Sequence, residues 1–191
     1  KAARKEGLLM AYHDRSDGGA FAAVAEMAFA GHCGVTFDLD GLDAKGDQLG
    51  ALFNEELGVV VQVGEQDAAR FAALAAEVGL GDCVQPIAVL NNSDEIKIRA
   101  QGSECFSAER SALQQIWSET SFELQKLRDN ADCAQEEFDL IGDASHSGLH
   151  AALSFDVNED VAAPFIATGV RPKVAVLREQ GVNGQVEMAA A

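Results

Sequence analysis

Residues 12–19 have the sequence Tyr-His-Asp-Arg-Ser-Asp-Gly-Gly and lead directly into an apolar segment, Ala20–Ala30. The stretch combines carboxylates, a hydroxyl and paired glycines at an expected helix start, where free N–H groups and the helix dipole attract anions. The glycines let the backbone approach a ligand closely, and an aspartate can hold a Mg²⁺ ion that bridges phosphate groups. These residues predict a magnesium-phosphate site, with an open alternative in which Asp17 or Ser16 simply caps the helix within a glycine turn.

Two adjacent acidic side chains elsewhere invite an acid–base interpretation. Glu55 and Glu56 follow Asn54 and come just before an apolar run, Val59–Val63. Neighbouring residues of a strand or its entry point in opposite directions, so two adjacent glutamates rarely face one substrate. We therefore expect residues 54–56 to form hydrogen bonds that shape an interface between modules, and not to transfer protons.

The cysteine and histidine side chains form no pattern for catalysis or metal binding. Four cysteines lie far apart, without the close pairs of zinc or redox motifs: Cys33, Cys83, Cys105 and Cys133. No base or cationic setting near them would activate a nucleophile, so we expect free thiols. His146 and His150 have the spacing of helical metal ligands, but they lie in a Ser/Gly-rich stretch without a third ligand, which favours a solvated loop.

The overall composition excludes several classes of partner. The chain has 191 residues, of which 48% are hydrophobic and only three are proline, so it can bury a core of ordinary size. Its formal net charge of −17 argues against nucleic acid or an anionic membrane as a partner, because both are bound through clustered Lys and Arg. A nucleotide held through a metal ion remains compatible. No apolar run approaches the roughly 20 residues that span a bilayer, and a signal-peptide core is lacking, so a cytoplasmic protein is expected.

Apolar periodicity and turn residues predict interleaved helices and strands up to Ala100. The expected helices are a terminal turn in Lys1–Leu9 closed near Gly7, Ala20–Ala30 ended by Gly31, and Asp67–Val78 ended by Gly79 and Gly81. The expected strands are Val35–Leu39, Val59–Val63 buried on both faces, and a hairpin of Val84–Leu90 and Ile96–Ala100 joined by Asn91–Asp94. This interleaving predicts an α+β fold with helices packed on a mixed sheet.

Residues 107–129 carry apolar side chains at three- and four-residue steps, which predicts one long amphipathic helix with Ser107 or Ser111 as its cap. Its apolar stripe consists of Leu113, Ile116, Trp117, Thr120, Leu124 and Leu127. A stripe at this spacing usually docks on its own domain, and we favour that interpretation over a partner-binding face.

The remaining residues are first acidic and then briefly apolar. No Lys or Arg occurs between Arg128 and Arg171, so self-repulsion of the acidic side chains predicts an extended linker over Asn130–Gly148. Val174–Leu177 is a short apolar run typical of a strand, and a helix is expected to open at Val186–Ala191 without a cap. Because the helix signals at both ends are incomplete, we expect the natural polypeptide to continue.

Several segments form an ordered series of recognisable motifs along nearly the whole chain. In order, they are His13–Gly19 with Ala25–Gly34, Leu52–Gly58, Leu127–Asn130, Ser154–Asp156 with Asn158–Pro164, and Arg171–Asn183. This series resembles the large single-chain form of phosphoribosylformylglycinamidine synthase. The resemblance weakens around Leu80–Gly102, around Ala131–Leu149 and at Gly184-Gln185. The Asp-x-Ser-x-Gly-Gly element also resembles selenophosphate synthetase, hydrogenase-maturation and thiamine-phosphate kinase relatives, but these carry no glutaminase domain to match the last segment.

The resemblance implies a domain organisation. Residues 1–106 would form the carboxyl half of the second synthetase-like module, with the fold of the aminoimidazole ribonucleotide synthetase carboxyl half. Residues 107–170 would be the long helix and an extended acidic connecting linker, and residues 171–191 the first strand and start of a class I glutaminase domain. The partner of this segment would be the remainder of the same polypeptide, with its amino-terminal synthetase-like modules and the rest of the glutaminase domain.

The resemblance also implies a reaction and site residues. The family is an ATP-dependent ligase of purine synthesis that converts formylglycinamide ribonucleotide, glutamine and ATP into the amidine. Its second module carries an auxiliary nucleotide, which implies that Asp14 ligates Mg²⁺ and that Ser16 contacts the phosphates of ATP or ADP. Gly181 and Asn183 would belong to the oxyanion region of the glutaminase domain.

No catalytic residue is implied within this segment, which by the same resemblance would be inactive alone. Arg15 is equally well explained as a phosphate contact or as a surface charge. A hypothesis of a different class remains open, in which the chain is a non-catalytic scaffolding or regulatory module with the same fold.

Overall fold

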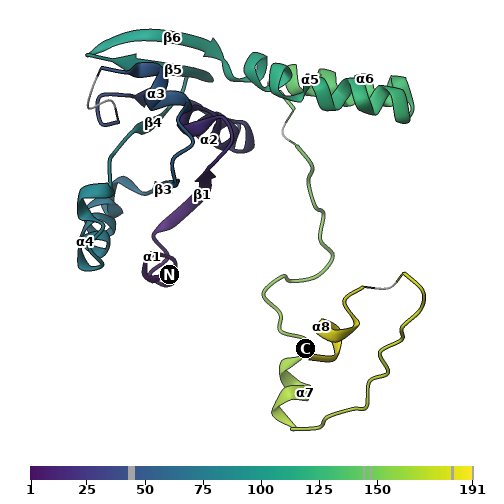
Figure 1. Ribbon diagram of the computed structural model, residues 1–191. Coiled ribbons are helices and arrows are strands. Elements are labelled where there is room, and N and C mark those ends of the chain that lie inside the picture. Colours follow the sequence, from purple (N-terminus) through teal and green to yellow (C-terminus); the bar gives the residue numbers. More distant parts are fainter. Residues whose placement is uncertain (43–45, 144, 147, 182, 191) are drawn as a thin grey trace. The chain divides into compact units, whose positions relative to one another are not determined.

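The computed structural model describes residues 1–42, 46–143, 145–146, 148–181 and 183–190. Two compact units make up the chain, Lys1–Ser147 and Gly148–Ala191. None of the described helices is long and apolar enough to cross a bilayer. The first unit contains all the strands of the described residues, and Figure 1 shows the order of its elements.

The core of the first unit lies between a mixed sheet and helix α2 (Gly19–Gly31). The sheet has four strands in the order β4 (Ala88–Asn91), β2 (Gly34–Asp38), β5 (Glu95–Ala100) and β6 (Ser103–Glu109). Strands β2 and β5 are parallel, whereas the other pairs are antiparallel. Fully buried side chains include Phe37 and Ile96, and α2 contributes Val24 and Phe29 to the same cluster. The expected α+β fold with helices on a mixed sheet is confirmed.

A separate two-stranded ribbon carries the glycine motif. Strand β1 (Leu9–Arg15) pairs antiparallel with β3 (Gly58–Val63), which places Asp14 opposite Val59. Between α2 and β3, helix α3 (Gln48–Phe53) leads into the pairing. The expectation that β3 is buried on both faces is wrong, because its first residues are exposed and Val59 is 54% accessible. Strand β3 has a single strand neighbour among the described residues, so one edge and much of its surface stay uncovered.

The expected hairpin between Val84–Leu90 and Ile96–Ala100 is wrong. The first of these strands is shorter than expected, and β2 lies between β4 and β5 in the sheet. The hairpin instead joins β5 to β6, through Gln101 and Gly102, whose φ angles of 52° and 72° suit a tight turn. Strand β6 takes residues that were assigned to the start of the long helix, so Ser107 is a strand residue and not a cap.

Glycines were predicted to end three helices, and this prediction holds for two of them. Helix α1 (Ala2–Lys5) is followed by Gly7 at a φ of 70°. Helix α4 (Ala68–Glu77) lies between the short turns η1 (Glu65–Asp67) and η2 (Gly81–Cys83), and Gly79 follows its C-cap residue with a φ of 77°. Helix α2 ends differently: Gly31 is still helical, and His32 adopts the left-handed conformation that glycine was expected to provide.

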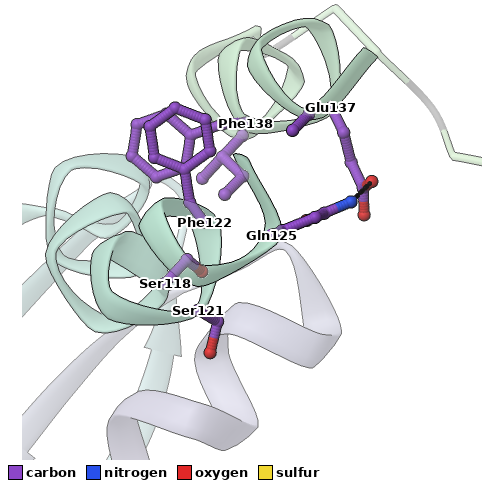
Figure 2. A pocket seen from close by; sticks show the side chains of 8 residues that line it. Ser118, Ser121, Phe122, Gln125, Glu137 and Phe138 are labelled. Carbon is purple, nitrogen blue, oxygen red and sulfur yellow. Dashed lines mark hydrogen bonds between the residues drawn. The ribbon is translucent and has the colours of Figure 1, made fainter. Parts of the chain in front are cut away.

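The long helix and the residues after it form a helical pair. Helix α5 (Arg110–Arg128) is followed by α6 (Ala131–Asp139) and the turn η3 (Leu140–Gly142). The rings of Phe122 and Phe138 stack with centroids 4.2 Å apart, and a pocket of about 190 Å³ lies beside them (Figure 2). The extended linker expected over Asn130–Gly148 is therefore partly wrong, because residues 131–142 are helical and an acidic composition did not prevent this.

The apolar stripe of α5 docks only in part, contrary to expectation. Leu113 packs against the core cluster, but Ile116, Trp117, Leu124 and Leu127 are all more than half exposed. The side chains that α5 buries are Arg110 and Phe122, neither of which belongs to the stripe. Arg110 anchors the helix start, because its Nε and Nη2 atoms donate to the two carboxylate oxygens of Asp94 at 2.6 and 3.1 Å.

The second unit contains two short helices, α7 (Ala163–Ala167) and α8 (Gln185–Ala190). The helix expected at Val186–Ala191 is confirmed up to Ala190, and Ala191 lies outside the described residues. The strand expected at Val174–Leu177 does not form. No described residue of this unit is buried.

Candidate functional site

Strand β1 directs its side chains to two different environments. Tyr12 and Asp14 are exposed, whereas His13 and Arg15 are partly buried on the other side of the ribbon. Ser16 follows the strand and is exposed two residues after Asp14. The structure therefore keeps both residues of the expected nucleotide site, Asp14 and Ser16, accessible to solvent.

The two glycines let this strand turn sharply into α2. Both have left-handed φ angles, 81° for Gly18 and 69° for Gly19, and the Gly19 N–H donates to the Ser16 carbonyl at 2.9 Å. A Cβ atom on Gly19 would lie 2.6 Å from the Leu52 carbonyl oxygen and 2.8 Å from the Cα of Phe53. A residue with a side chain cannot occupy this position unless the end of α3 moves.

The residues after α3 hold the glycine turn from the side. Arg15 Nε donates to the Asn54 carbonyl at 2.9 Å, and the Gly18 N–H donates to a Glu55 carboxylate oxygen at 3.2 Å. Glu56 lies 3.9 Å from the Arg15 guanidinium. These contacts agree with the expectation that residues 54–56 form hydrogen bonds, while their place at an interface between modules stays a prediction. The Arg15 side chain is 15% exposed, and its main contact is this internal one. This contact is neither the phosphate contact nor the surface charge expected for Arg15.

Helix α2 begins without a side-chain cap. Its N-cap residue is Gly18, and no side-chain hydrogen bond caps the helix start. The capping alternative for Asp17 or Ser16 is therefore not observed. The N–H groups of Gly18 and Gly19 already donate to Glu55 and to the Ser16 carbonyl, so an anion at this helix start would meet the N–H groups of the residues that follow Gly19.

Hydrogen bonds orient the side chains of the motif. The Tyr12 hydroxyl donates to Asp14 Oδ1 at 2.6 Å, and this bond to a carboxylate raises the pKa of Tyr12. His13 Nδ1 lies 2.6 Å from the Asp14 carbonyl oxygen, and its Nε2 lies 2.7 Å from Glu26 Oε2. The hydrogen bond to the Asp14 carbonyl raises the pKa of His13 most, and the hydrogen bond to the Glu26 carboxylate raises it further. Because both ring nitrogens face acceptors, the arrangement favours the imidazolium form.

Comparison with known proteins identifies the family. A family model described as the carboxyl-terminal domain of AIR synthase related proteins matches residues 1–101. The chain belongs to this family.

Solved structures show the same fold as this AIR synthase related domain. Thermotoga maritima PurL complexed with ATP aligns with a TM-score of 0.52 and 18% identity, over 59% of this chain and 20% of that chain. The same protein complexed with FGAR gives 0.51 and 18%, over 59% and 19%. Its ADP complex gives 0.51 and 18%, over 59% and 20%. The chain thus spans about a fifth of the length of these structures, which share its fold.

The residues of the AIR synthase related domain fit one part of a magnesium-nucleotide site. The described residues contain no group of three or more His, Cys, Asp or Glu side chains that could hold a metal ion. Asp14 offers a carboxylate, Ser16 a hydroxyl and α2 the N–H groups that follow Gly19, which together suit one metal ligand and a phosphate. Further ligands would have to come from outside this domain.

The other predicted site residues lie in the second unit. Gly181 has a φ of 85°, and the Asn183 side chain accepts a hydrogen bond from the Gly184 N–H at 2.9 Å. Both residues are exposed, and Val182 between them lies outside the described residues. The strand expected to lead into this segment does not form among the described residues, and the role of Gly181 and Asn183 in an oxyanion region stays a prediction.

The cysteines are free thiols and His146 and His150 lie outside helices, as the sequence predicts. All four cysteines are free, and Cys33 is the one that is not fully exposed. His146 and His150 lie outside any helix, so they lack the helical spacing of metal ligands.

Sequence reasoning missed Glu26 and misread Trp117. Glu26 Oε1 accepts a hydrogen bond from the Trp117 indole N–H at 2.9 Å, while its Oε2 contacts His13. Ninety-one positions separate Glu26 from Trp117, and no local pattern connects them. Trp117 was assigned to the apolar stripe because of its spacing, although its indole nitrogen required a polar partner.

Proposed function

We propose that this chain contributes Asp14 and Ser16 to an auxiliary Mg-nucleotide site in an ATP-dependent ligase of purine biosynthesis. The reaction would convert formylglycinamide ribonucleotide, glutamine and ATP into formylglycinamidine ribonucleotide. The observation that carries this proposal is the exposed pair Asp14 and Ser16 beside the uncapped start of α2, within a domain of the AIR synthase related family. The ATP, ADP and FGAR complexes of the structurally similar PurL support the choice of ligands.

In this proposal each residue has a defined task. Asp14 would supply one carboxylate ligand to Mg²⁺, with Tyr12 holding its other oxygen in place. Ser16 and the N–H groups of α2 that follow Gly19 would bind phosphate oxygens, and Gly18 and Gly19 would let the backbone approach them. A bound Mg²⁺ neutralises phosphate charge and orients the phosphate groups. Strand β3 supports the turn by pairing with β1, and residues 54–56 support it through hydrogen bonds to Arg15 and Gly18.

The domain organisation belongs to the same proposal. Residues 1–106 are proposed as the carboxyl half of a synthetase-like module, and residues 107–170 as its long helix and connection. Residues 171–191, including Gly181 and Asn183, are proposed as the start of a glutaminase domain that supplies ammonia from glutamine. The remaining modules of the same polypeptide would be the partner of this segment, and the segment alone would have no activity.

The test is the nucleotide content of the complete enzyme that carries this segment. After gel filtration in Mg²⁺, the protein is denatured and the released nucleotide is quantified for wild type, Asp14→Asn and Asp17→Asn. We expect Asp14→Asn to lose the nucleotide, while Asp17→Asn, an exposed acid in the same turn, keeps it. Glutamine hydrolysis, measured separately, should change less than nucleotide retention.

The outcomes separate the hypotheses. Full retention in Asp14→Asn would remove Asp14 from the site. A wild-type protein that never carries or binds a nucleotide would favour the scaffolding or regulatory hypothesis. Loss in both variants would indicate that the charge of the turn matters and not a specific ligand.

A further inference from the structure

Three elements meet at the carboxylate of Glu26. The side chain lies in the middle of α2, and each of its oxygens has a different partner. Oε2 lies 2.7 Å from His13 Nε2 of β1, and Oε1 accepts from Trp117 Nε1 of α5 at 2.9 Å. One side chain therefore connects the long helix to the strand that ends in the glycine turn.

The connection continues from His13 to the backbone at Asp14. The second ring nitrogen of His13 lies 2.6 Å from the Asp14 carbonyl oxygen. The imidazole thus lies between the Glu26 carboxylate and the carbonyl of Asp14. Trp117, Glu26, His13 and Asp14 form one continuous series of hydrogen bonds from α5 to the turn.

Partial burial and charge strengthen these hydrogen bonds. The side chains of His13 and Glu26 are 30% and 31% exposed, so water only partly competes for their hydrogen bonds. A charged partner makes such bonds stronger than neutral ones. The Trp117 ring also packs against Phe29 of the core, with centroids 6.0 Å apart, so a ring contact accompanies the hydrogen bond of its indole N–H.

We propose that Glu26 is a positioning residue that couples the docking of α5 to the geometry of the turn Asp14–Gly19. The coupling between α5 and the turn does not depend on the proposed function. Only its response to a bound nucleotide rests on that function. If ligand binding at Asp14 favours the connected arrangement, it also favours the docked position of α5, and a docked α5 favours binding by the same factor.

The first experiment needs no ligand. Hydrogen exchange of peptides covering residues 13–19 is compared for the wild-type chain, Trp117→Phe and Glu26→Ala. Trp117→Phe keeps an aromatic ring against Phe29 but removes the N–H donor. We expect exchange at residues 13–19 to rise about fivefold or more in both variants, at the lower end of ordinary coupling energies. Glu119→Ala, an exposed glutamate of α5, is the matched control and should change nothing.

A conservative variant guards against a trivial folding defect. Glu26→Gln retains an oxygen for Trp117 and an amide that can donate to a neutral His13 ring, so exchange should return close to that of wild type. If exchange at residues 13–19 in Trp117→Phe stays within about twofold of wild type, the coupling is overturned. A twofold change is smaller than the change of about fivefold or more that ordinary coupling between sites produces. Equal exchange in Glu26→Gln and Glu26→Ala would overturn the assigned role of the Glu26 hydrogen bonds.

The second experiment uses the single tryptophan as a reporter. Trp117 is the only Trp of the chain, so emission of the chain comes from the α5 end of the series. With MgCl₂ and ADP added, and with ADP binding measured by equilibrium dialysis, we expect a change in Trp117 emission in wild type and in Glu26→Gln but not in Glu26→Ala. Bound ADP without a change in wild-type emission overturns the link to the nucleotide. If this segment alone binds no ADP, the proposed function is decided by the nucleotide content of the complete enzyme, and the exchange experiment decides the coupling.

Discussion

The two units of the chain differ in whether any of their apolar side chains are buried. In the first unit Phe37, Leu39 and Ile96 are fully buried between the mixed sheet and α2. In the second unit Phe165 is 72% exposed and Leu177 is 85% exposed, and no described residue is buried. Both units contain short apolar runs, so apolar content alone does not decide burial.

The difference lies in the neighbours that each apolar run finds. Strand β2 has a strand on both sides, and its N–H and C=O groups are paired with β4 and β5. The run Val174–Leu177 has no strand beside it among the described residues, and unpaired backbone groups stay in water. A run of strand type therefore becomes a strand only where other strands complete its hydrogen bonds. This comparison predicts where substitutions cost stability and where they do not.

The largest effect is expected from Phe37→Ala. Phe37 has no exposed surface, and its removal leaves a cavity in the centre of the first unit. The substitution should lower the free energy of unfolding by about 3–5 kcal/mol. Urea denaturation followed by Trp117 emission would measure it. A loss below about 1 kcal/mol would show that the buried cluster does not hold this unit together.

The next effect concerns the glycine turn and not the core. Gly19→Ala should cost at least about 2 kcal/mol, because a left-handed φ is strained for alanine and its Cβ meets the backbone of α3. Gly7→Ala is the control, since Gly7 has a similar φ of 70° but nothing within 4 Å of an added Cβ. The difference between the two denaturation midpoints isolates the close approach. Equal costs would mean that α3 moves away freely.

A smaller effect is expected at the edge of the first unit. Trp117 is 60% exposed, so Trp117→Ala should cost about 1–2 kcal/mol and not the 3–5 kcal/mol expected of a docked aromatic residue. The cost includes the hydrogen bond to Glu26 and the contact with Phe29. Unfolding followed by circular dichroism is the measurement, because the variant has no tryptophan. Leu127→Ala, at 86% exposure, should stay within about 0.5 kcal/mol of wild type.

The sequence was sufficient for elements that local signals define. The periodicity of residues 20–30 and of residues 67–78 located α2 and α4, because each helix has a continuous apolar face and a terminal stop. The glycine turn was located by Gly18 and Gly19, and the structure gives both the left-handed angles that glycine permits.

The sequence was insufficient where a partner decides the outcome. Strand β2 separates β4 from β5, and no turn residue can reveal that a third strand enters between two successive ones. Strand β6 reads Ser-Glu-Cys-Phe-Ser-Ala-Glu and owes its structure to pairing with β5, since its side chains are mostly exposed. Helix α6 had a local signal that was overlooked, because Asn130 accepts from the Cys133 N–H at 3.0 Å as a cap.

The candidate site shows the same division. Asp14 and Ser16 were chosen by motif, and the structure leaves both exposed, although their roles remain predictions. The support from residues 54–56 depends on the register of β1 and β3, which places Asp14 opposite Val59. Glu26 has no motif at all, because its partners come from two distant elements.

The smallest effect is expected in the second unit, and it tests the comparison most directly. Leu177→Ser replaces an apolar side chain that is 85% exposed in a run without strand neighbours. Nothing packed is lost, so the free energy of unfolding of the 191-residue chain should change by less than about 0.5 kcal/mol. Leu39→Ser, which changes a fully buried leucine in the same way, should instead destabilise the first unit strongly. If Leu177→Ser costs as much as Leu39→Ser, Leu177 is buried in solution, and the contrast between the two units is then not a property of their sequences.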